Sequence, residues 1–340
     1  MEDAKSVPRR LDPEETRAAG PPTRAYWTAD QLPRGTAFEP VFVWITRSAA
    51  LLVMLLLAAI CAVLVHDSLP ALRAFGWSFV TSASWNPVTE RFGALAPIYG
   101  ALVTSAIAML IGVPLALGAA VFLTELCPFR LRPILNTTVE LLAAVPSVIY
   151  GMWGLFVFAP FMARRVQPLL IGALGEVPGV GLLFQGPPYG IGMLTAGIIL
   201  GFMVLPFIAA VSRQVFATMP PVLREASYGV GATTWEFCLR VLLPYSRAGL
   251  VGAVMLGLGR ALGETMAVTF VIGNAHRVSA SLLAPGTTIS ATLANEFTEA
   301  VGDLYLSSLL ALGLILFVIT FAVLVAARFI LSRVGTRASL

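Results

Sequence analysis

Six long apolar runs are the feature of this 340-residue sequence that most restricts its fold. An apolar run of about 18 or more residues can cross a bilayer core of roughly 30 Å as a helix. Only 12% of the residues are charged, about half the share in an ordinary soluble domain. We therefore predict an all-α, polytopic membrane protein with six transmembrane helices. The runs lie near Val41 to Val65, Pro97 to Leu123, Ile134 to Pro160, Ile191 to Val211, Gly249 to Ile272 and Tyr305 to Leu331.

Two regions of the chain differ in composition. Residues 1–40 are rich in proline and charged side chains and poor in apolar ones, which favours a flexible arm. This segment is unlike the short basic region that precedes a signal-peptide cleavage site, so we expect the first helix to remain uncleaved. Residues 41–340 contain all six runs and are predicted to form one transmembrane domain.

Lysine and arginine are unevenly distributed between the links that join the runs. Sixteen of them lie in the N-terminal arm with the entrance of the first run, in the second and fourth links and at the C-terminal end. The other three links hold five. Because cytoplasmic segments carry the excess of positive charge, both termini are predicted to be cytoplasmic. The same bias accounts for the net charge of +4, so no nucleic-acid partner is expected.

Several kinds of enzyme are excluded by what the sequence lacks. Lys5 is the only lysine, and no G-x-x-x-x-G-K-[ST] loop is present to hold the phosphates of ATP. His66 and His276 are the only histidines, and neither belongs to a metal-binding or Ser-His motif. We therefore expect no catalytic residue, metal or cofactor in this chain.

The predicted cytoplasmic link 220–248 contains the stretch EASYGVGATTWEFCLRVLLP at residues 225–244. Its apolar spacing predicts two short amphipathic helices separated by glycines, with Pro244 ending the second. Pattern alone allows a helical hairpin on the membrane surface. The stretch resembles the E-A-A loop of bacterial ABC-importer membrane subunits, with matches at Glu225, Ala226, Ser227, Gly231, Val241, Leu243 and Pro244. The resemblance implies coupling helices that dock on a separate subunit, which binds ATP-Mg and hydrolyses the ATP.

Four longer stretches resemble the phosphate-specific importer permeases of the PstC type. They are GALAPIYGALVTS, ELLAAVPSVIYGMWGLFVFAP, GLGRALGETMAVTFVIGN and LANEFTEA. The resemblance implies a type I ABC-importer permease of the bacterial inner membrane that translocates inorganic phosphate. The implied partners are a PstA-type permease in a heterodimer, a PstB-type ATPase dimer and a PstS-type binding protein. Import of another oxyanion, such as molybdate or sulfate, and proton-coupled secondary transport remain alternatives.

Arg260 and Glu264 are the only charged residues in the fifth run. A charge deep in the membrane costs about 2.5–3.5 kcal/mol, whereas pairing four residues apart on one helix recovers only about 0.2–0.5 kcal/mol. One interpretation is a buried ion pair that fixes helix packing. The other is a substrate pathway, because a guanidinium meets phosphate oxygens bidentately. Glu264 would then hold the arginine between passages, or accept a hydrogen bond from protonated phosphate.

Weaker candidates lie elsewhere in the chain. Glu140 is predicted about two turns inside the third helix, where it either contributes to the substrate pathway or extends to the cytoplasmic interface. Asn295, Glu296 and Glu299 fall in the last outward link. They are candidates either for docking of the binding protein or for an ordinary solvated surface.

Overall fold

The computed structural model describes residues 39–335, and within this range every regular element is helical apart from an isolated bridge between Asn86 and Arg91. The predicted arm, residues 1–40, lies almost wholly outside the described residues. The elements are α2 (Glu39–Phe75), α3 (Ser78–Thr81), α4 (Leu95–Val121), η2 (Phe122–Leu126), α5 (Arg132–Ala143), α6 (Ser147–Trp153), η3 (Gly154–Phe158), α7 (Ala159–Phe161), η4 (Met162–Val166), α8 (Gln167–Leu174), η5 (Gly181–Phe184), α9 (Met193–Ala217), α10 (Pro221–Gly229), α11 (Thr234–Phe237), η6 (Cys238–Leu242), α12 (Leu243–Gly263), α13 (Met266–Ile272), α14 (Ile289–Glu296) and α15 (Asp303–Gly335).

Six helices in the described part of the chain are long and apolar enough to cross a membrane, so the predicted all-α fold and the predicted number of spans are confirmed. They are Pro40–Phe75, Leu95–Leu126, Ser147–Leu174, Met193–Ala217, Thr234–Gly263 and Asp303–Ala326. The chain divides into two compact units, Met1–Ile60 and Cys61–Leu340, and α2 runs through the boundary.

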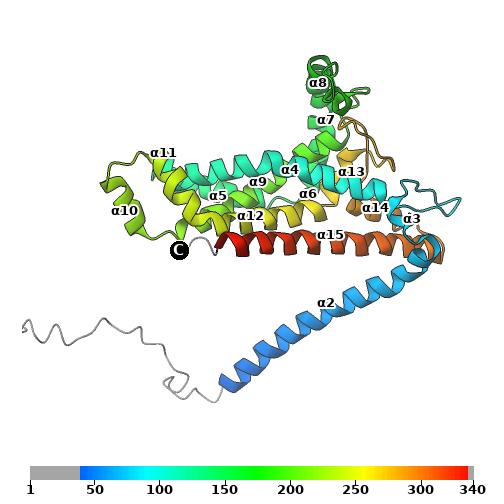
Figure 1. The fold of residues 1–340 in the computed structure, drawn as a ribbon, viewed down its shortest axis with the longest axis horizontal. Coiled ribbons are helices and arrows are strands. Elements are labelled where there is room, and N and C mark those ends of the chain that lie inside the picture. The colour runs from blue at the N-terminus through cyan, green and yellow to red at the C-terminus, as the bar shows by residue number, and fades with distance from the viewer. Residues whose placement is uncertain (1–38, 336–340) are drawn as a thin grey trace, which may run out of the picture. The chain divides into compact units, whose positions relative to one another are not determined.

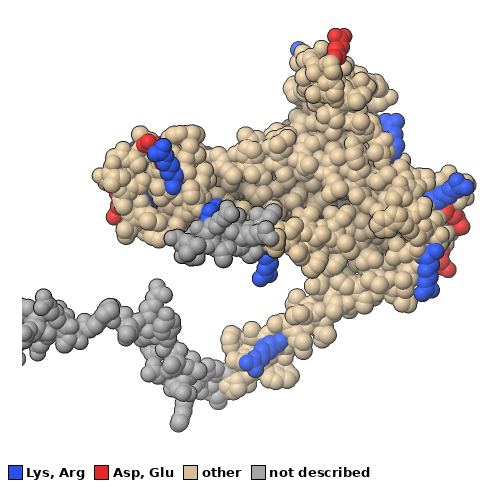
Figure 2. Space-filling model, in the orientation of Figure 1, with Lys and Arg blue, Asp and Glu red and all other residues tan. Residues whose placement is uncertain are grey.

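Within the second unit, α4, α9, α12 and α15 run side by side (Figure 1). The helices α10 and α11 lie at one end of this bundle, and α3 and α14 lie at the other (Figure 1). Figure 2 shows most of the charged side chains at the two ends and over α8, with few on the bundle between them. Scarcity of charge between charged ends is expected of a membrane-spanning bundle, because a charge within the membrane is costly.

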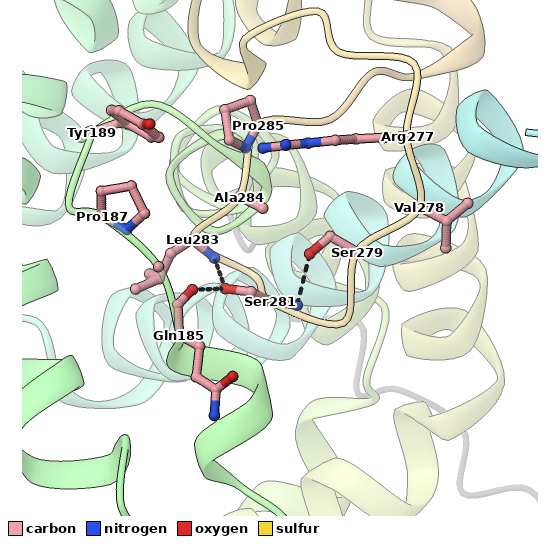
Figure 3. Close-up of a pocket in the computed structure, with 11 residues that line it drawn as sticks. Gln185, Pro187, Tyr189, Arg277, Val278, Ser279, Ser281, Leu283, Ala284 and Pro285 are labelled. Atoms are coloured by element: carbon pink, nitrogen blue, oxygen red, sulfur yellow. Dashed lines mark hydrogen bonds between the residues drawn. The ribbon is translucent and has the colours of Figure 1, made fainter. Parts of the chain in front are cut away.

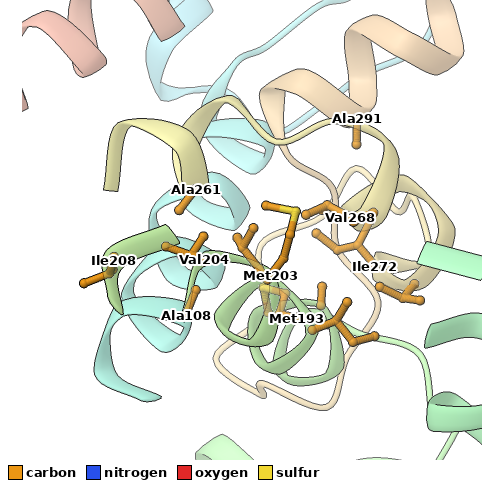
Figure 4. Close-up of a cluster of buried hydrophobic side chains, with 14 of the residues drawn as sticks. Ala108, Met193, Met203, Val204, Ile208, Ala261, Val268, Ile272 and Ala291 are labelled. Atoms are coloured by element: carbon orange, nitrogen blue, oxygen red, sulfur yellow. The ribbon is translucent and has the colours of Figure 1, made fainter. Parts of the chain in front are cut away.

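The core of the second unit surrounds α9. Buried side chains of α4, α9, α12 and α13 meet there, among them Ala108, Met203, Val204 and Ala261 (Figure 4). The helices α4 and α9 approach closely at two glycines. A Cβ added at Gly112 would lie only 3.2 Å from the carbonyl oxygen of Gly201. Small residues at such a crossing allow two membrane helices to pack backbone against backbone.

The third span differs from the predicted run Ile134 to Pro160. The helix α5 ends at Ala143, the chain turns at Pro146 with an extended backbone, and α6 begins at Ser147. A proline disfavours helical geometry in the residue before it, which explains the break. The span itself continues to Leu174 through a series of π-helical turns.

The fifth span begins earlier than predicted. Thr233 and Glu236 form a capping box that starts α11, and the helix then continues through η6 into α12. Pro244 therefore does not end a short helix, as the sequence pattern suggested. It is the second residue of α12, just after the π-helical turn η6, which changes the usual hydrogen-bond spacing, so the missing proline N–H does not stop the helix.

Candidate functional site

The fifth span ends inside the charged motif. The helix α12 stops at Gly263, Glu264 adopts an extended backbone with φ −69° and ψ 126°, and α13 starts at Met266. The predicted continuous helix from Gly249 to Ile272 is therefore wrong. Because Glu264 has left the helix, it does not share a helix face with Arg260, and in the described part of the chain no ion pair joins them.

Each of these two charges instead lies at a helix end. Arg260 is in the last turn of α12, where the helix dipole favours a cation. Glu264 directly precedes Thr265, the N-cap residue of α13, and its Oε1 accepts a hydrogen bond from the backbone N–H of Ala267 in the first turn at 3.2 Å, so it acts as a cap for this helix. The second carboxylate oxygen, Oε2, has no hydrogen-bond partner among residues 39–335. The helix break therefore accommodates both charges without pairing them.

The guanidinium of Arg260 rests on an aromatic ring. Its Cζ lies 5.8 Å from the ring centroid of Phe207 on α9, within the range of a cation–π contact. The hydroxyl of Tyr150 on α6 is also within electrostatic reach. Arg260 is exposed, whereas the adjacent Ala261 is buried in the core (Figure 4). Nothing in the sequence indicated this contact with Phe207, because a phenylalanine is an ordinary residue in an apolar membrane span.

Glu140 is not inside the third span, contrary to the sequence prediction. It lies on α5, and its Oε1 accepts a hydrogen bond from Nη2 of Arg213 on α9 at 2.5 Å. In the described chain, no hydrogen bond or ion pair joins Glu140 to Arg260 or Glu264. Arg260 and Glu264 therefore lie on the two sides of the helix break, whereas Glu140 forms an ion pair with Arg213 between α5 and α9.

The seven motif residues of the loop divide into two groups. Glu225, Ala226 and Ser227 lie on α10, which has no buried residue. Gly231 follows with φ +87°, and its N–H donates to the carbonyl oxygen of Tyr228 at 3.0 Å, so a left-handed glycine ends α10. The remaining residues are Val241, Leu243 and Pro244, of which the first two pack against a buried cluster containing Phe216, Phe237 and Leu242.

A buried carboxylate connects this loop to the second span. Nη2 of Arg224 donates to Oε1 of Glu125 at 2.6 Å, and the Glu125 side chain is only 4% exposed. The guanidinium of Arg224 also lies 5.9 Å from the ring centroid of Phe237. Arg224 therefore contacts η2 and α11 while it is part of α10. Sequence reasoning missed this pair, because its members are 99 positions apart.

At the other end of the bundle, Glu296 is engaged within the chain. Its Oε2 accepts hydrogen bonds from Nε1 of Trp85, at 3.3 Å, and from the hydroxyl of Tyr305. The ring of His276 stacks on Trp85 with centroids 5.3 Å apart. Burial lowers the pKa of His276, and nearby Glu296 opposes this effect by a smaller amount. Glu296 therefore holds two elements together rather than projecting freely as a docking residue.

The same end carries a pocket of 320 Å³ between the segments 185–189 and 277–285 (Figure 3). Arg277 extends across it, and the hydroxyl of Ser281 donates to the carbonyl oxygen of Gln185 at 2.5 Å. Along the chain, the seven-residue helix α13 lies between Glu264 and the segment 277–285 of this pocket. Among the described residues, no three His, Cys, Asp or Glu side chains are grouped to hold a metal ion.

Comparisons with known proteins agree over most of the chain. The family model described as "Binding-protein-dependent transport system inner membrane component" matches residues 112–336. The "Phosphate transport system permease protein PstC" of Mesorhizobium japonicum is 62% identical over 299 residues, which are 88% of this chain and 91% of that protein. The protein of the same name from Haemophilus influenzae is 51% identical over 298 residues, which are 88% of this chain and 94% of that protein. A "Probable phosphate transport system permease protein PstC" of Methanocaldococcus jannaschii is 37% identical over 295 residues, which are 85% of this chain and 92% of that protein.

Solved structures of ABC transporters share the fold. A chain of the alginate ABC transporter superposes with a TM-score of 0.58 at 17% identity, covering 88% of this chain and 98% of that one. A chain of the MetNI methionine ABC transporter superposes with a TM-score of 0.53 at 18% identity, covering 70% and 94%. These two likenesses concern the fold, whereas the sequence relatives identify the subgroup. The chain belongs to the family of binding-protein-dependent transport system inner membrane components, as a permease of the PstC type.

Proposed function

We propose that this chain is the permease subunit through which an ATP-driven importer moves inorganic phosphate into the cell. The observation that carries the proposal is Arg260. Its guanidinium is exposed at a helix break within a membrane-spanning segment and has no carboxylate partner in the described chain. Helix packing does not require such a residue, whereas passage of an anion does.

Phosphate is favoured as the substrate by the names of the relatives and by the chemistry of the helix break. The planar guanidinium of Arg260 offers paired N–H donors that match two phosphate oxygens. The free Oε2 of Glu264 can accept a hydrogen bond from the hydroxyl of a protonated phosphate. Fully ionised sulfate offers no such donor. One arginine next to a carboxylate also binds an anion weakly enough to release it, as conduction requires.

Energy for transport is proposed to enter through α10. No residue of this helix is buried, and Trp235 on the following helix, α11, is 71% exposed. A largely apolar hollow of 510 Å³ lies between the start of the fifth span and the end of the second span, and is lined by Trp235, Leu239 and residues of the second span. We assign this surface to the cytoplasmic side, where a groove on a PstB-type ATPase dimer would receive it. ATP and Mg²⁺ would bind that dimer, because this chain has no P-loop.

A second, PstA-type permease is proposed to cover the outer face of α12. Leu256 on this helix is 55% exposed, and a Cβ added at Gly259 or Gly263 would meet no atom within 4 Å. Small residues four positions apart allow a neighbouring membrane helix to approach closely. The partner would complete a pathway that Arg260 lines from one side. A PstS-type binding protein would deliver phosphate at the opposite end from α10.

Competition by other oxyanions tests the substrate. We expect cells that depend on this importer to take up labelled phosphate in the presence of a hundredfold excess of sulfate or molybdate, because neither anion donates a hydrogen bond to a carboxylate at neutral pH. Uptake should stop when ATP is depleted and the membrane potential is maintained. Inhibition by sulfate or molybdate would instead assign a different oxyanion, and uptake without ATP would indicate proton-coupled transport.

Glu264→Gln tests whether the carboxylate acts on the substrate or only caps α13. Glutamine keeps a carbonyl oxygen for the N–H of Ala267, so the cap and the assembly should survive. It replaces Oε2 by an amide group that cannot accept the phosphate hydrogen bond. We expect the uptake rate to fall on the order of 10- to 100-fold, the range for losing a charge-assisted hydrogen bond. Full uptake by an assembled Glu264→Gln importer would reduce this residue to a helix cap.

A further inference from the structure

Arg260 contacts Phe207, and the role that we infer below for this contact rests on the proposed function. An arginine in a membrane span needs something to hold its side chain in position between substrate passages. The sequence suggested Glu264, but the helix break directs that carboxylate to the backbone of α13. Among residues 39–335, no ion pair involves Arg260, and its guanidinium contacts the ring of Phe207.

The Phe207 ring is itself well anchored. It is partly buried on α9 and packs against the core cluster, and its chain neighbours Pro206 and Ile208 are buried. The ring therefore presents a fixed surface at 5.8 Å from Cζ of Arg260. The nearby hydroxyl of Tyr150 donates to the carbonyl oxygen of Leu142 at 3.1 Å, and among residues 39–335 no hydrogen bond joins it to Arg260.

An aromatic partner suits an arginine that must bind an anion repeatedly. A carboxylate occupies the N–H donors of a guanidinium and neutralises its charge, so a phosphate has to displace it. A ring face attracts the cation through its quadrupole and leaves the five N–H donors free. The geometry points to Phe207 as the positioning residue of Arg260: it holds the guanidinium toward the pathway without competing for phosphate oxygens.

The electron density of the ring tests this assignment. Phe207 is replaced by 4-cyanophenylalanine or by 4-methylphenylalanine in the complete importer, reconstituted in vesicles with its ATPase, second permease and binding protein. The two rings are similar in size, but the cyano group withdraws the electron density that attracts a cation. We expect phosphate uptake to be on the order of two- to fivefold slower with the cyano ring, at equal recovery of the complex. A structural role would not distinguish the two rings.

Phe202 provides the matched control on the same helix. Its ring packs edge-on against Phe158 with centroids 6.3 Å apart, and the cation–π contacts found among residues 39–335 do not involve it. The same two replacements at Phe202 should give equal uptake rates. If the para group crowds position 207, 3,5-difluorophenylalanine makes the same electronic change in nearly the volume of phenylalanine.

The outcomes separate this inference from the proposed function. Equal uptake with both rings at position 207, in an importer that transports phosphate, would overturn the positioning role and leave the proposed function intact. A similar difference between the two rings at position 202 would also overturn it, because the effect would not depend on Arg260. Absence of phosphate uptake by the wild-type importer would overturn the proposed function and this inference with it.

Discussion

Replacing Arg260 by alanine is expected to abolish phosphate uptake while the permease still assembles with its ATPase. The variant removes the guanidinium that we propose meets the anion at the helix break, and each charge-assisted hydrogen bond lost costs about 1.5–3 kcal/mol. Two such bonds to one phosphate correspond to a rate loss on the order of a hundredfold or more. Uptake of labelled phosphate in cells that lack other phosphate importers measures the loss, and co-purification with the ATPase measures assembly.

Two further variants make the Arg260 result specific. Arg260→Lys keeps the positive charge but not the planar fork, so it should retain a measurable part of the uptake. Arg165→Ala removes an exposed arginine on η4, in the segment that leads to α8, and should leave uptake unchanged. Normal uptake by an assembled Arg260→Ala importer would show that the anion does not need this residue.

Gly231→Val is expected to uncouple the permease from ATP hydrolysis. Gly231 has φ +87°, and a β-branched side chain disfavours this left-handed backbone by at least about 1–2 kcal/mol. The strain shifts the loop conformation about 5- to 30-fold away from the one that places Glu225, Ala226 and Ser227 on α10. Phosphate uptake and the ATPase activity stimulated by the binding protein should therefore fall together. Both can be measured in reconstituted vesicles.

Gly229→Val is the matched control for the loop. Gly229 is two residues earlier, lies within α10 and has open space around the position of a Cβ. Its backbone is not left-handed, so valine there adds no comparable strain. This variant should retain most of the uptake. Equal behaviour of the two variants, with both fully active, would mean that the turn at Gly231 has no part in coupling and would favour a transporter that works without an ATPase.

The sequence predicted the membrane fold well, because the number of spans depends only on the length and composition of apolar runs. It failed where a helix is interrupted within such a run. The break at Glu264 follows no proline, and an arginine four residues before a glutamate looks the same in a continuous helix. The break before Ser147 was signalled by Pro146, but prolines also occur inside membrane helices, as Pro114 and Pro206 do here.

The candidate site was partly predictable for a related reason. Arg260 stood out because a charge inside an apolar run is costly wherever the helix ends. Its neighbours did not stand out, since the contact with Phe207 depends on how α9 crosses α12. The ion pairs of Glu125 with Arg224 and of Glu140 with Arg213 likewise join residues far apart in the chain. Only the packed helices bring such pairs together.

We propose that Arg260 is kept within the membrane because an anion meets its positive charge on the way through. Chemical restoration of that charge tests it most directly. In an Arg260→Cys importer with Cys61, Cys127 and Cys238 replaced by serine, 2-aminoethyl methanethiosulfonate attaches an ammonium group through a disulfide bond. The matched reagent 2-sulfonatoethyl methanethiosulfonate attaches an anion. We predict that the ammonium group restores part of the phosphate uptake and that the sulfonate restores none. Complete labelling at position 260 with no recovery by the ammonium group, or with equal recovery by both groups, would contradict the claim.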